Sequence, residues 1–394
     1  MTRIDNVELD NADLVVVGAG FYGMTVAERA AAEGFNVVVL DKRDHIGGNA
    51  YSYEDSATGI EIHKYGPHVF HTNSEQIFAY LSKFTEWSPY EQRTWSLSKG
   101  RVYPLPINLA TISLFNGRVM SPSEARAWVA ETASEITEPR NLEEKAISLI
   151  GRPLYETFVK GYTAKQWQTD PRELPADIIS RLPVRFNYDN RYFNDTYQCL
   201  PRDGYTPIFE KMCDTRRIAV HLGVDWFDLA AHRRPPAPVV YTGPIDRYFD
   251  YRFGILGWRT IDLELETIET EDFQGCPVMN YADPDIPWTR ISEFKHFHPS
   301  RTYGPRTVIA REFSRSAGQK DDPYYPINLV EDKARYNSYR ELAQAETDVF
   351  FGGRLGTYRY LDMHQAIGAA LSAWEKHLRP HLANGAPLEL RGVG

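Results

Sequence analysis

The chain has 394 residues and a formal net charge of -9, with 42% hydrophobic and 25% charged residues. This length is too great for one simple core and suits two or three packed units. The negative charge provides no general attraction to nucleic acid or to anionic membranes, so we expect neither as a partner. No run approaches the length of a membrane span and the N-terminus lacks an apolar signal region, so we expect a soluble, cytoplasmic protein.

A nucleotide-binding pattern occupies residues 14–49. An apolar strand at Leu14–Val17 is followed by a helix-length segment from Phe21 to Ala32. A second β-branched strand, Val37–Leu40, then ends on Asp41. This order of strand, helix, strand and acid is typical of a Rossmann-like dinucleotide-binding unit.

Glycines at G-x-G-x-x-G spacing, Gly18, Gly20 and Gly23, connect the first strand to the helix. The first lets the strand turn sharply, the second lets a pyrophosphate approach the backbone, and the third lets the helix pack close to the strand. The helix N-terminus then presents free N–H groups to the phosphates. Asp41 lies 18 residues beyond Gly23, where a carboxylate can bind the ribose hydroxyls of an adenosine.

A second glycine pair follows the acid, in the sequence Lys42, Arg43, then Gly47, Gly48 and Asn49. NAD-binding units usually lack such a pair, whereas many FAD-binding units carry it. We therefore interpret the ligand as FAD.

Three histidines, His63, His68 and His71, lie in a turn-rich stretch at residues 59–72. No cysteine or carboxylate set nearby completes a metal site. The pattern favours a glycine-containing loop laid against a flat ring, with His68 facing the ring. For His63 and His71 we favour a structural role, the pairing of buried backbone groups.

The hydrophobic period becomes helical after this stretch. Segments at residues 74–84, 121–136 and 142–150 have apolar spacing near 3.6, and a short polar hairpin lies at 93–104. Together they predict a helical insertion over about 75–180. Its end is rich in aromatic and basic residues, including Tyr162, Lys165, Trp167, Arg181 and Arg185.

The nucleotide-binding unit then resumes. An apolar strand from Ala237 ends on Thr242 and Gly243, which is typical of a chain returning to a cofactor. A β-patterned region at 258–313 carries Asn280 and Arg290 and predicts a twisted antiparallel sheet.

Near the C-terminus, the sequence VFFGGRLGTYRYLDMHQ predicts a strand, a glycine turn and a helix after Leu361, with Asp362 near its start. The N–H groups of this helix and Arg354 can meet the phosphate and ribityl side of a flavin. We therefore predict an α/β fold with three units. These are a discontinuous FAD-binding domain at 1–74, 205–250 and 318–394, a helical domain with a mobile loop at 75–180, and an antiparallel sheet domain at 181–204 and 251–317.

The three cysteines, Cys199, Cys213 and Cys276, form no C-x-x-C pair and have no metal-ligand spacing. This predicts reduced, structural thiols and no metal site.

Several unusual motifs resemble those of the bacterial UDP-galactopyranose mutase family, with actinobacterial members nearest. They are IEIHKYGPHVFHT, KGYTAKQW, RLPVR, NRYF, YYPIN and FGGRLGTYRYLDMH, and the resemblance runs from about residue 12 to residue 380. It implies a flavoenzyme that interconverts UDP-galactopyranose and UDP-galactofuranose for cell-wall galactan with no net redox change. It also implies a homodimer.

In that family only reduced FAD is active, and its N5 attacks the anomeric carbon while UDP leaves. The sugar ring then opens and recloses through another hydroxyl, and UDP returns. The resemblance implies that Arg181 and Arg290 clamp the diphosphate and that His68 lies against the isoalloxazine; these three are the expected catalytic residues.

Further roles are implied for the matched positions. Tyr162 is expected to stack on uracil, Trp167 to belong to a mobile active-site loop, and Asn280 to contact the sugar side. The expected phosphate-binding hydroxyls are those of Tyr192, Tyr325 and Tyr360. The expected FAD-binding residues are Gly18, Gly20, Phe21, Gly23, Asp41, Lys42, Gly48, Asn49, His68, Val220, Thr242, Gly243, Arg354, Leu361, Asp362 and Met363.

Two other functions share parts of this pattern. A flavin oxidoreductase of the amine-oxidase type would share the Rossmann start and the sheet, but it would not need cations for UDP. A non-catalytic binding protein, like the regulators of small GTPases that use a similar two-domain fold, would not need an intact cofactor frame from Gly18 to Asp362.

Overall fold

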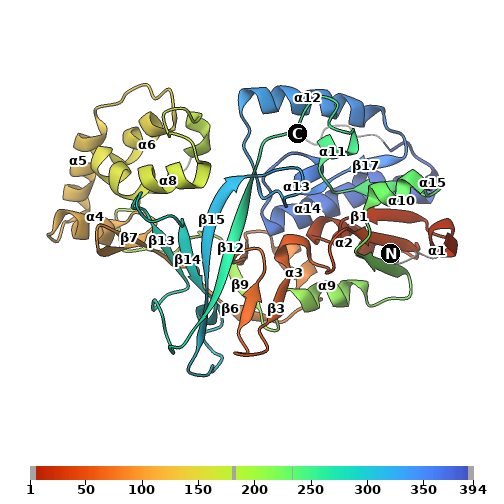
Figure 1. Ribbon diagram of the computed structural model, residues 1–394, viewed down its shortest axis with the longest axis horizontal. Coiled ribbons are helices and arrows are strands. Elements are labelled where there is room, and N and C mark those ends of the chain that lie inside the picture. The colour runs from red at the N-terminus through yellow and green to blue at the C-terminus, as the bar shows by residue number, and fades with distance from the viewer. Residues whose placement is uncertain (1–5, 180–182, 233, 389–394) are drawn as a thin grey trace.

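The computed structural model describes residues 6–179, 183–232 and 234–388. A five-stranded parallel sheet in the order β10-β2-β1-β11-β17 lies in the right-hand lobe of Figure 1. Its strands are β1 (Leu14–Val17), β2 (Val37–Asp41), β10 (Ile218–Leu222), β11 (Val239–Tyr241) and β17 (Val349–Phe351). The predicted first strand and the helix after it have the predicted bounds.

Alternate residues of β1 and β2 pack into two separate hydrophobic cores. Val16 and Val39 belong to the first, and Val15 and Val38 to the second. Because both faces are covered, these strands are almost purely β-branched. Helices contributing to the first core are α2 (Phe21–Ala32), α9 (Thr206–Cys213) and α14 (Met363–Ala373); those contributing to the second are α1 (Asn6–Asp10), α10 (Trp226–His232), α11 (Ile245–Tyr248) and α12 (Val330–Ala345).

A second sheet of seven strands, in the order β16-β12-β15-β14-β13-β7-β8, stands between the two lobes (Figure 1). Its strands are β7 (Thr94–Ser98), β8 (Arg101–Leu105), β12 (Trp258–Ile268), β13 (Val278–Tyr281), β14 (Arg290–Glu293), β15 (Thr307–Ser316) and β16 (Tyr325–Pro326). One pair, β13 with β7, runs parallel, so the sheet is mixed where the sequence predicts an antiparallel one. This pair joins distant parts of the chain through a long crossover, which permits the parallel direction.

The left-hand lobe of Figure 1 is helical and has its own core, which includes Ile112, Ala125 and Ile147. The sequence sets the helix starts: the Ser121 side chain accepts a hydrogen bond from the Glu124 N–H in a capping box. The helices are α4 (Leu109–Asn116), α5 (Pro122–Ala133), α6 (Leu142–Ile150), α7 (Arg152–Leu154) and α8 (Lys160–Trp167). The hairpin of β7 and β8 lies within residues 75–180, the range of the predicted helical domain. In the structure, its strand β7 pairs with β13, so the hairpin forms one edge of the large sheet.

Smaller elements connect these parts. Two-stranded and three-stranded sheets are formed by β3 (Ser52–Glu54) with β4 (Glu61–His63), and by β5 (Phe70–Thr72), β9 (Tyr197–Pro201) and β6 (Trp87–Pro89). Strand β9 thus pairs with β5 and β6 and lies outside the large sheet. The remaining helices are α3 (Glu75–Leu81), α13 (Gly353–Gly356) and α15 (Arg379–Asn384), with 3-10 turns at Gly48–Ala50, Ala176–Ile179 and Phe294–Phe297 and π-helical turns at Tyr155–Val159 and Trp374–Leu378.

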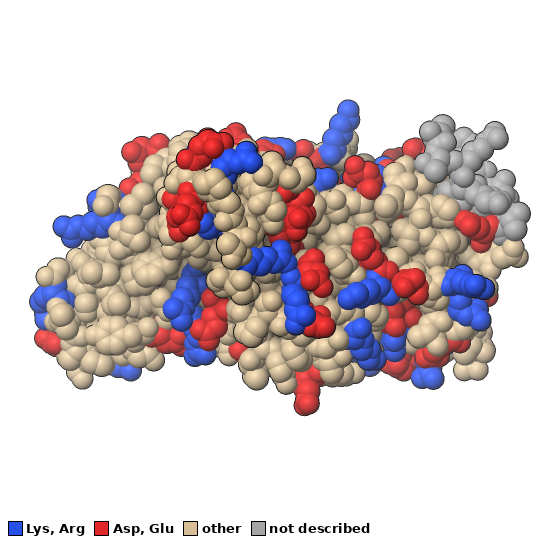
Figure 2. All heavy atoms as spheres, turned by 90° about the horizontal axis from the view of Figure 1, so that it is seen from below, with Lys and Arg blue, Asp and Glu red and all other residues tan. Residues whose placement is uncertain are grey.

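Charged side chains of both signs alternate over the face shown in Figure 2, without a large patch of one sign. Within the described ranges, no helix has the length and apolar character needed to cross a membrane.

Candidate active site

The predicted glycines form a cradle in which Gly18 and Gly23 have no room for a side chain and Gly20 and Gly48 pack against each other. Gly18 has φ +110°, and a Cβ on it would lie 2.0 Å from Thr242 Oγ1. A Cβ on Gly23 would lie 2.0 Å from the carbonyl oxygen of Gly18. A Cβ on Gly48 would lie 3.0 Å from the Cα of Gly20, so the two glycine segments meet. Because Gly20 caps α2 without a side-chain acceptor, the first N–H groups of this helix are available to a phosphate.

Asp41 is buried at the end of β2, and both of its carboxylate oxygens accept backbone hydrogen bonds. The Ala19 N–H donates to Oδ2 over 2.8 Å and the Arg43 N–H donates to Oδ1 over 2.9 Å. These bonds orient the carboxylate beside the cradle, and each oxygen keeps acceptor capacity for a ribose hydroxyl.

The two cations after Asp41 meet a carboxylate that sequence reasoning missed. Lys42 Nζ is 3.2 Å and Arg43 Nη2 is 3.0 Å from the carboxylate of Asp322. Asp322 is 280 positions further along the chain, so no local pattern could have indicated it. It neutralises positive charge at this end of the cavity and ties the segment before β16 to the cradle.

A cavity runs from this cradle toward His68. It is lined by nearly all of the predicted FAD-binding residues: Gly18, Gly20, Phe21, Gly23, Asp41, Lys42, Gly48, Asn49, His68, Thr242, Gly243, Arg354, Leu361 and Met363. The bare glycine cradle, the helix N-terminus and the buried acid fit an adenine dinucleotide such as FAD. Val220 does not line this cavity, because it lies in the middle of β10; Val224, which follows that strand, lines it instead.

His68 is one of the residues that line this cavity. Its Nδ1 is 2.7 Å from the Gly66 carbonyl oxygen, and since a carbonyl can only accept, Nδ1 carries the proton and Nε2 is left as an acceptor. Burial lowers the pKa of His68 to about 3, so the ring is neutral at physiological pH. The ring can therefore contact a flavin without adding positive charge.

The other two histidines of this stretch have different partners. His63 Nδ1 accepts the N–H of His68 over 2.9 Å, which confirms the structural role expected for it. His71 does not pair with backbone as expected: its Nδ1 lies 2.8 Å from a carboxylate oxygen of Asp195, because β5 and β9 bring these segments together. His71, Asp362 and His364 also bring ligand atoms within 4.8 Å of one another.

Arg354 donates hydrogen bonds to other parts of the protein. Its guanidinium donates to the carbonyl oxygens of Tyr324 and Leu361 over 3.0 and 2.6 Å and lies 4.8 Å from the centroid of the Tyr360 ring. The arginine thus fixes the segment 360–362 beside the cofactor cavity.

A second cavity of about 700 Å3 lies between the helical lobe and the large sheet. The predicted substrate-binding residues within the described ranges all line it: Tyr162, Trp167, Tyr192, Asn280, Arg290, Tyr325 and Tyr360. Asp362, expected to bind the cofactor, lines this second cavity. Arg181 lies outside the described residues.

Sheet register brings the polar residues of the second cavity together. Asn280 on β13 is directly opposite Arg290 on β14, which in turn is opposite Glu312 on β15. Directly opposed residues share a face of the sheet, so these side chains project to the same side. Burial alone would lower the pKa of Arg290, but the Glu312 carboxylate raises it well above the ordinary value, and the guanidinium stays charged.

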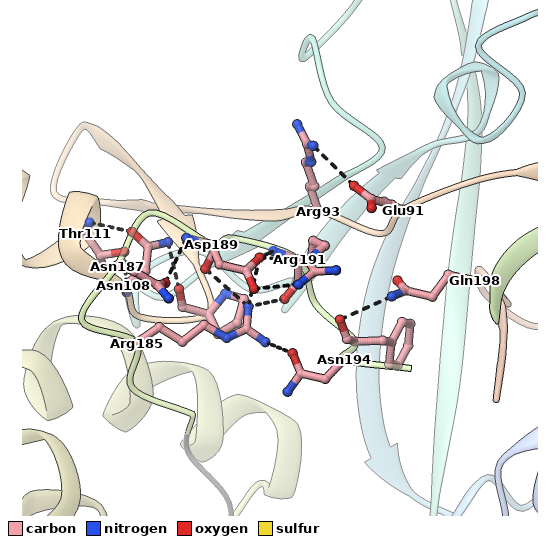
Figure 3. Close-up of polar contacts among 12 residues, drawn as sticks. Glu91, Arg93, Asn108, Thr111, Arg185, Asn187, Asp189, Arg191, Asn194 and Gln198 are labelled. Atoms are coloured by element: carbon pink, nitrogen blue, oxygen red, sulfur yellow. Dashed lines mark hydrogen bonds and ion pairs between the residues drawn. The ribbon is translucent and has the colours of Figure 1, made fainter. Parts of the chain in front are cut away.

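The loop carrying Tyr192 is held by an arginine from the RLPVR motif. Figure 3 shows Arg185 pointing into this loop, where Nη2 donates to Asn194 Oδ1 over 2.6 Å and Nη1 donates to the carbonyl oxygens of Asp189 and Arg191. The sequence marks Arg185 only as one of several basic residues near the end of the helical insertion. In the structure it organises the residues around the exposed Tyr192.

The two cavities meet along two short segments. Pro67 and Val69 line the second cavity while His68 between them lines the first. In the same way Asp362 lines the second cavity and its neighbours Leu361 and Met363 line the first. The two cavities therefore adjoin at these two segments.

Comparisons with known proteins agree with this geometry. A family model described as UDP-galactopyranose mutase matches residues 157–360, and one described as an NAD(P)-binding Rossmann-like domain matches residues 16–84. A solved structure, that of reduced UDP-galactopyranose mutase, has the same fold, with a TM-score of 0.71 at 15% identity over 95% of this chain and 98% of that one.

Two curated relatives are similar over nearly their whole length. A probable UDP-galactopyranose mutase from Klebsiella pneumoniae is 45% identical over 371 residues, covering 94% of this chain and 96% of the relative. A dTDP-fucopyranose mutase from Escherichia coli is 41% identical over 371 residues, covering 93% and 98%. With such similarity along its whole length, the chain belongs to the UDP-galactopyranose mutase family of FAD-dependent isomerases.

Proposed function

We propose that this enzyme interconverts UDP-galactopyranose and UDP-galactofuranose without net redox change. The observation that carries the proposal is that the two cavities border the same two segments, residues 67–69 and 361–363. A dinucleotide cofactor held by the glycine cradle would direct its ring toward a cavity that contains a permanently charged arginine and several tyrosine hydroxyls. An oxidoreductase would need the first cavity but has no use for a diphosphate-binding cation in the second.

The chemistry needs a leaving group that departs and returns. Reduced FAD, held by the residues of the first cavity, would supply the nucleophile that replaces UDP at the anomeric carbon and is itself displaced when UDP returns. The C–O bond to UDP breaks, the sugar ring oxygen is exchanged for another hydroxyl, and the C–O bond to the same UDP forms again. Atoms and electrons balance with no external oxidant, which fits an isomerase.

The side chains have holding and orienting roles in this proposal. Arg290 binds the diphosphate as a permanent cation and keeps UDP in place between departure and return, with Arg181 expected to do the same. Tyr192, Tyr325 and Tyr360 supply hydroxyl groups at the cavity wall. Neutral His68 would lie beside the cofactor ring without adding positive charge to it.

A second substrate pair must be tested alongside the first, because a relative of almost equal similarity is a dTDP-fucopyranose mutase. The two sugars differ in the hydroxyl at C6 and the two nucleotides in the thymine methyl and the ribose hydroxyl. The stacking role proposed for Tyr162 suits either pyrimidine.

The test is to incubate the purified yellow protein with UDP-galactofuranose or dTDP-fucofuranose, with and without dithionite, and to separate the products by chromatography. We expect conversion of the UDP-sugar only after reduction. Equal conversion with and without dithionite, or no conversion, would refute the proposal, and faster conversion of the dTDP-sugar would reassign the substrate. The homodimer expected from the family resemblance is tested on the same sample by light scattering.

A further inference from the structure

Lys165 is a half-buried lysine on α8 whose ammonium group binds backbone carbonyl oxygens instead of a carboxylate. Its Nζ lies within hydrogen-bonding distance of four carbonyl oxygens, those of Tyr281 at 2.7 Å, Asp283 at 2.9 Å, Ile286 at 3.0 Å and Trp288 at 3.1 Å. An ammonium group has three N–H donors, so this cage satisfies all of them. A neutral methylene chain could not hold four converging carbonyl dipoles together.

Three of these carbonyls belong to the connection between β13 and β14, residues 282–289, and the fourth is that of Tyr281, the last residue of β13. The first residues of this connection are also fixed from the other side, since Ser98 Oγ and the Lys99 N–H donate to the carboxylate of Asp283 over 2.9 and 2.7 Å. The connection is therefore held between the β7–β8 turn and α8. Its conformation depends on both partners.

A glycine on the same helix shows how closely α8 presses on this connection. A Cβ on Gly161 would lie 2.2 Å from the Ala282 carbonyl oxygen. Only a residue without a side chain allows the helix backbone to come so near. Gly161 and Lys165 are four positions apart and so lie on one face of the helix, which makes them two independent contacts to the same segment.

The elements joined by these contacts carry the substrate-binding residues. Tyr162 and Trp167 lie on α8, whereas Asn280 lies on β13 before the connection and Arg290 begins β14 after it. Lys165 itself is absent from the lining of the second cavity. Lys165 thus links α8, which forms the helical wall of the cavity, to the sheet that forms the other wall, through contacts outside the cavity lining.

We propose that Lys165 is a positioning residue whose ammonium group locks α8 to the β13–β14 connection and so sets Tyr162 and Arg290 at the separation that a nucleotide diphosphate requires. The proposal deepens the function proposed above and rests on it for the identity of the ligand. A displacement of one wall by about 1 Å can reduce the efficiency of an enzyme by up to about a hundredfold.

The test compares Lys165→Met and Gly161→Ala with Lys160→Met, which removes an exposed lysine from the same helix. UDP affinity of the oxidised holoenzyme is measured by fluorescence, and KM and kcat with UDP-galactofuranose after reduction. We expect Lys165→Met and Gly161→Ala to weaken UDP binding and raise KM by about tenfold or more, with a smaller change in kcat and unchanged flavin content. Lys165→Arg, which keeps the charge, should recover part of the affinity. UDP affinity equal to that of Lys160→Met in both variants would overturn the proposal.

A second readout does not depend on the substrate. Hydrogen exchange of peptides covering residues 281–289 should be faster in Lys165→Met and Gly161→Ala than in Lys160→Met, because the connection loses its contact with α8. If the wild-type protein binds no UDP, the proposed function fails while this exchange measurement still tests the lock. Unchanged exchange in both variants would show that Lys165 does not hold the segment.

Discussion

Glu312 lies directly across the sheet from Arg290, and its Oε1 is 3.1 Å from Nε of the arginine. The carboxylate is almost fully buried, and it also accepts a hydrogen bond from Thr289 Oγ1 over 3.3 Å. The contact is an ion pair of poor hydrogen-bond angle, since the Nε–H of Arg290 has no acceptor among the described residues. Glu312 thus fixes the cation at the wall of the second cavity.

We predict that Glu312→Gln lowers kcat/KM by about tenfold to a hundredfold and leaves flavin content unchanged. The amide keeps the size of the side chain but removes the charge that holds the guanidinium in place. Steady-state kinetics of the reduced enzyme measure the effect. The matched control is Glu264→Gln, an exposed acid on β12, and an equal loss in both variants would contradict the prediction.

Removal of the arginine itself should separate catalysis from cofactor binding. Arg290→Ala is expected to abolish turnover while the protein stays yellow, because Arg290 lines the second cavity and not the first. Flavin absorbance and product chromatography on the same preparation provide both measurements. Loss of flavin in this variant would mean that Arg290 has been assigned to the wrong site.

A substitution in the glycine cradle should instead remove the flavin from the protein. In Gly23→Ala the new methyl group would lie 2.0 Å from the Gly18 carbonyl oxygen and must push the phosphate-binding turn out of shape. We expect purified protein with less than about a tenth of the wild-type flavin content. Gly304→Ala, where no atom lies within 4 Å of the new Cβ, should keep full flavin content.

His63 should make the protein less stable in mild acid. Burial lowers its pKa from 6.5 to about 4, so between these values the unfolded chain binds a proton that the folded chain excludes. The free energy of unfolding should therefore fall as the pH drops, by about 1 kcal/mol from this residue between about pH 7 and about pH 5.5.

Urea unfolding of the holoenzyme at these two pH values measures that loss. In His63→Asn, whose amide oxygen can still accept the His68 N–H, the fall in stability should be smaller by about 1 kcal/mol. The same pH dependence in both proteins would show that His63 does not exclude the proton.

The cysteines should differ in reactivity in the folded protein. Burial raises the pKa of both Cys199 and Cys276 to about 12, and the thiolate is the reactive form. Iodoacetamide at about pH 8 should modify partly exposed Cys213 first, with the other two labelled only after unfolding in urea. Peptide mass spectrometry identifies the sites, and rapid native labelling of Cys199 would contradict the prediction.

Local patterns predicted the elements that local interactions decide. The strand at β1, the helix α2 and the helix α6 have the expected bounds because hydrophobic periodicity, glycines and caps act within a few residues. The cavity residues His68, Tyr162 and Arg290 were assigned by their motifs, and the structure brings them to two adjoining cavities. Val220 is predicted to bind the cofactor, but its place in the middle of β10 keeps it out of the lining of the first cavity.

Pairings between distant segments could not be predicted in this way. The parallel pairing of β13 with β7, the ion pair of Lys42 and Arg43 with Asp322, and the lock of Lys165 on residues 281–289 each join residues about 100 or more positions apart, and nothing in the local pattern specifies the partner. The sequence by itself determined which cofactor class and which site residues to expect, because the glycine spacing and the motifs are local chemistry. Only the tertiary structure decided how the two cavities meet and what holds their walls, because those contacts form when separate lobes pack together.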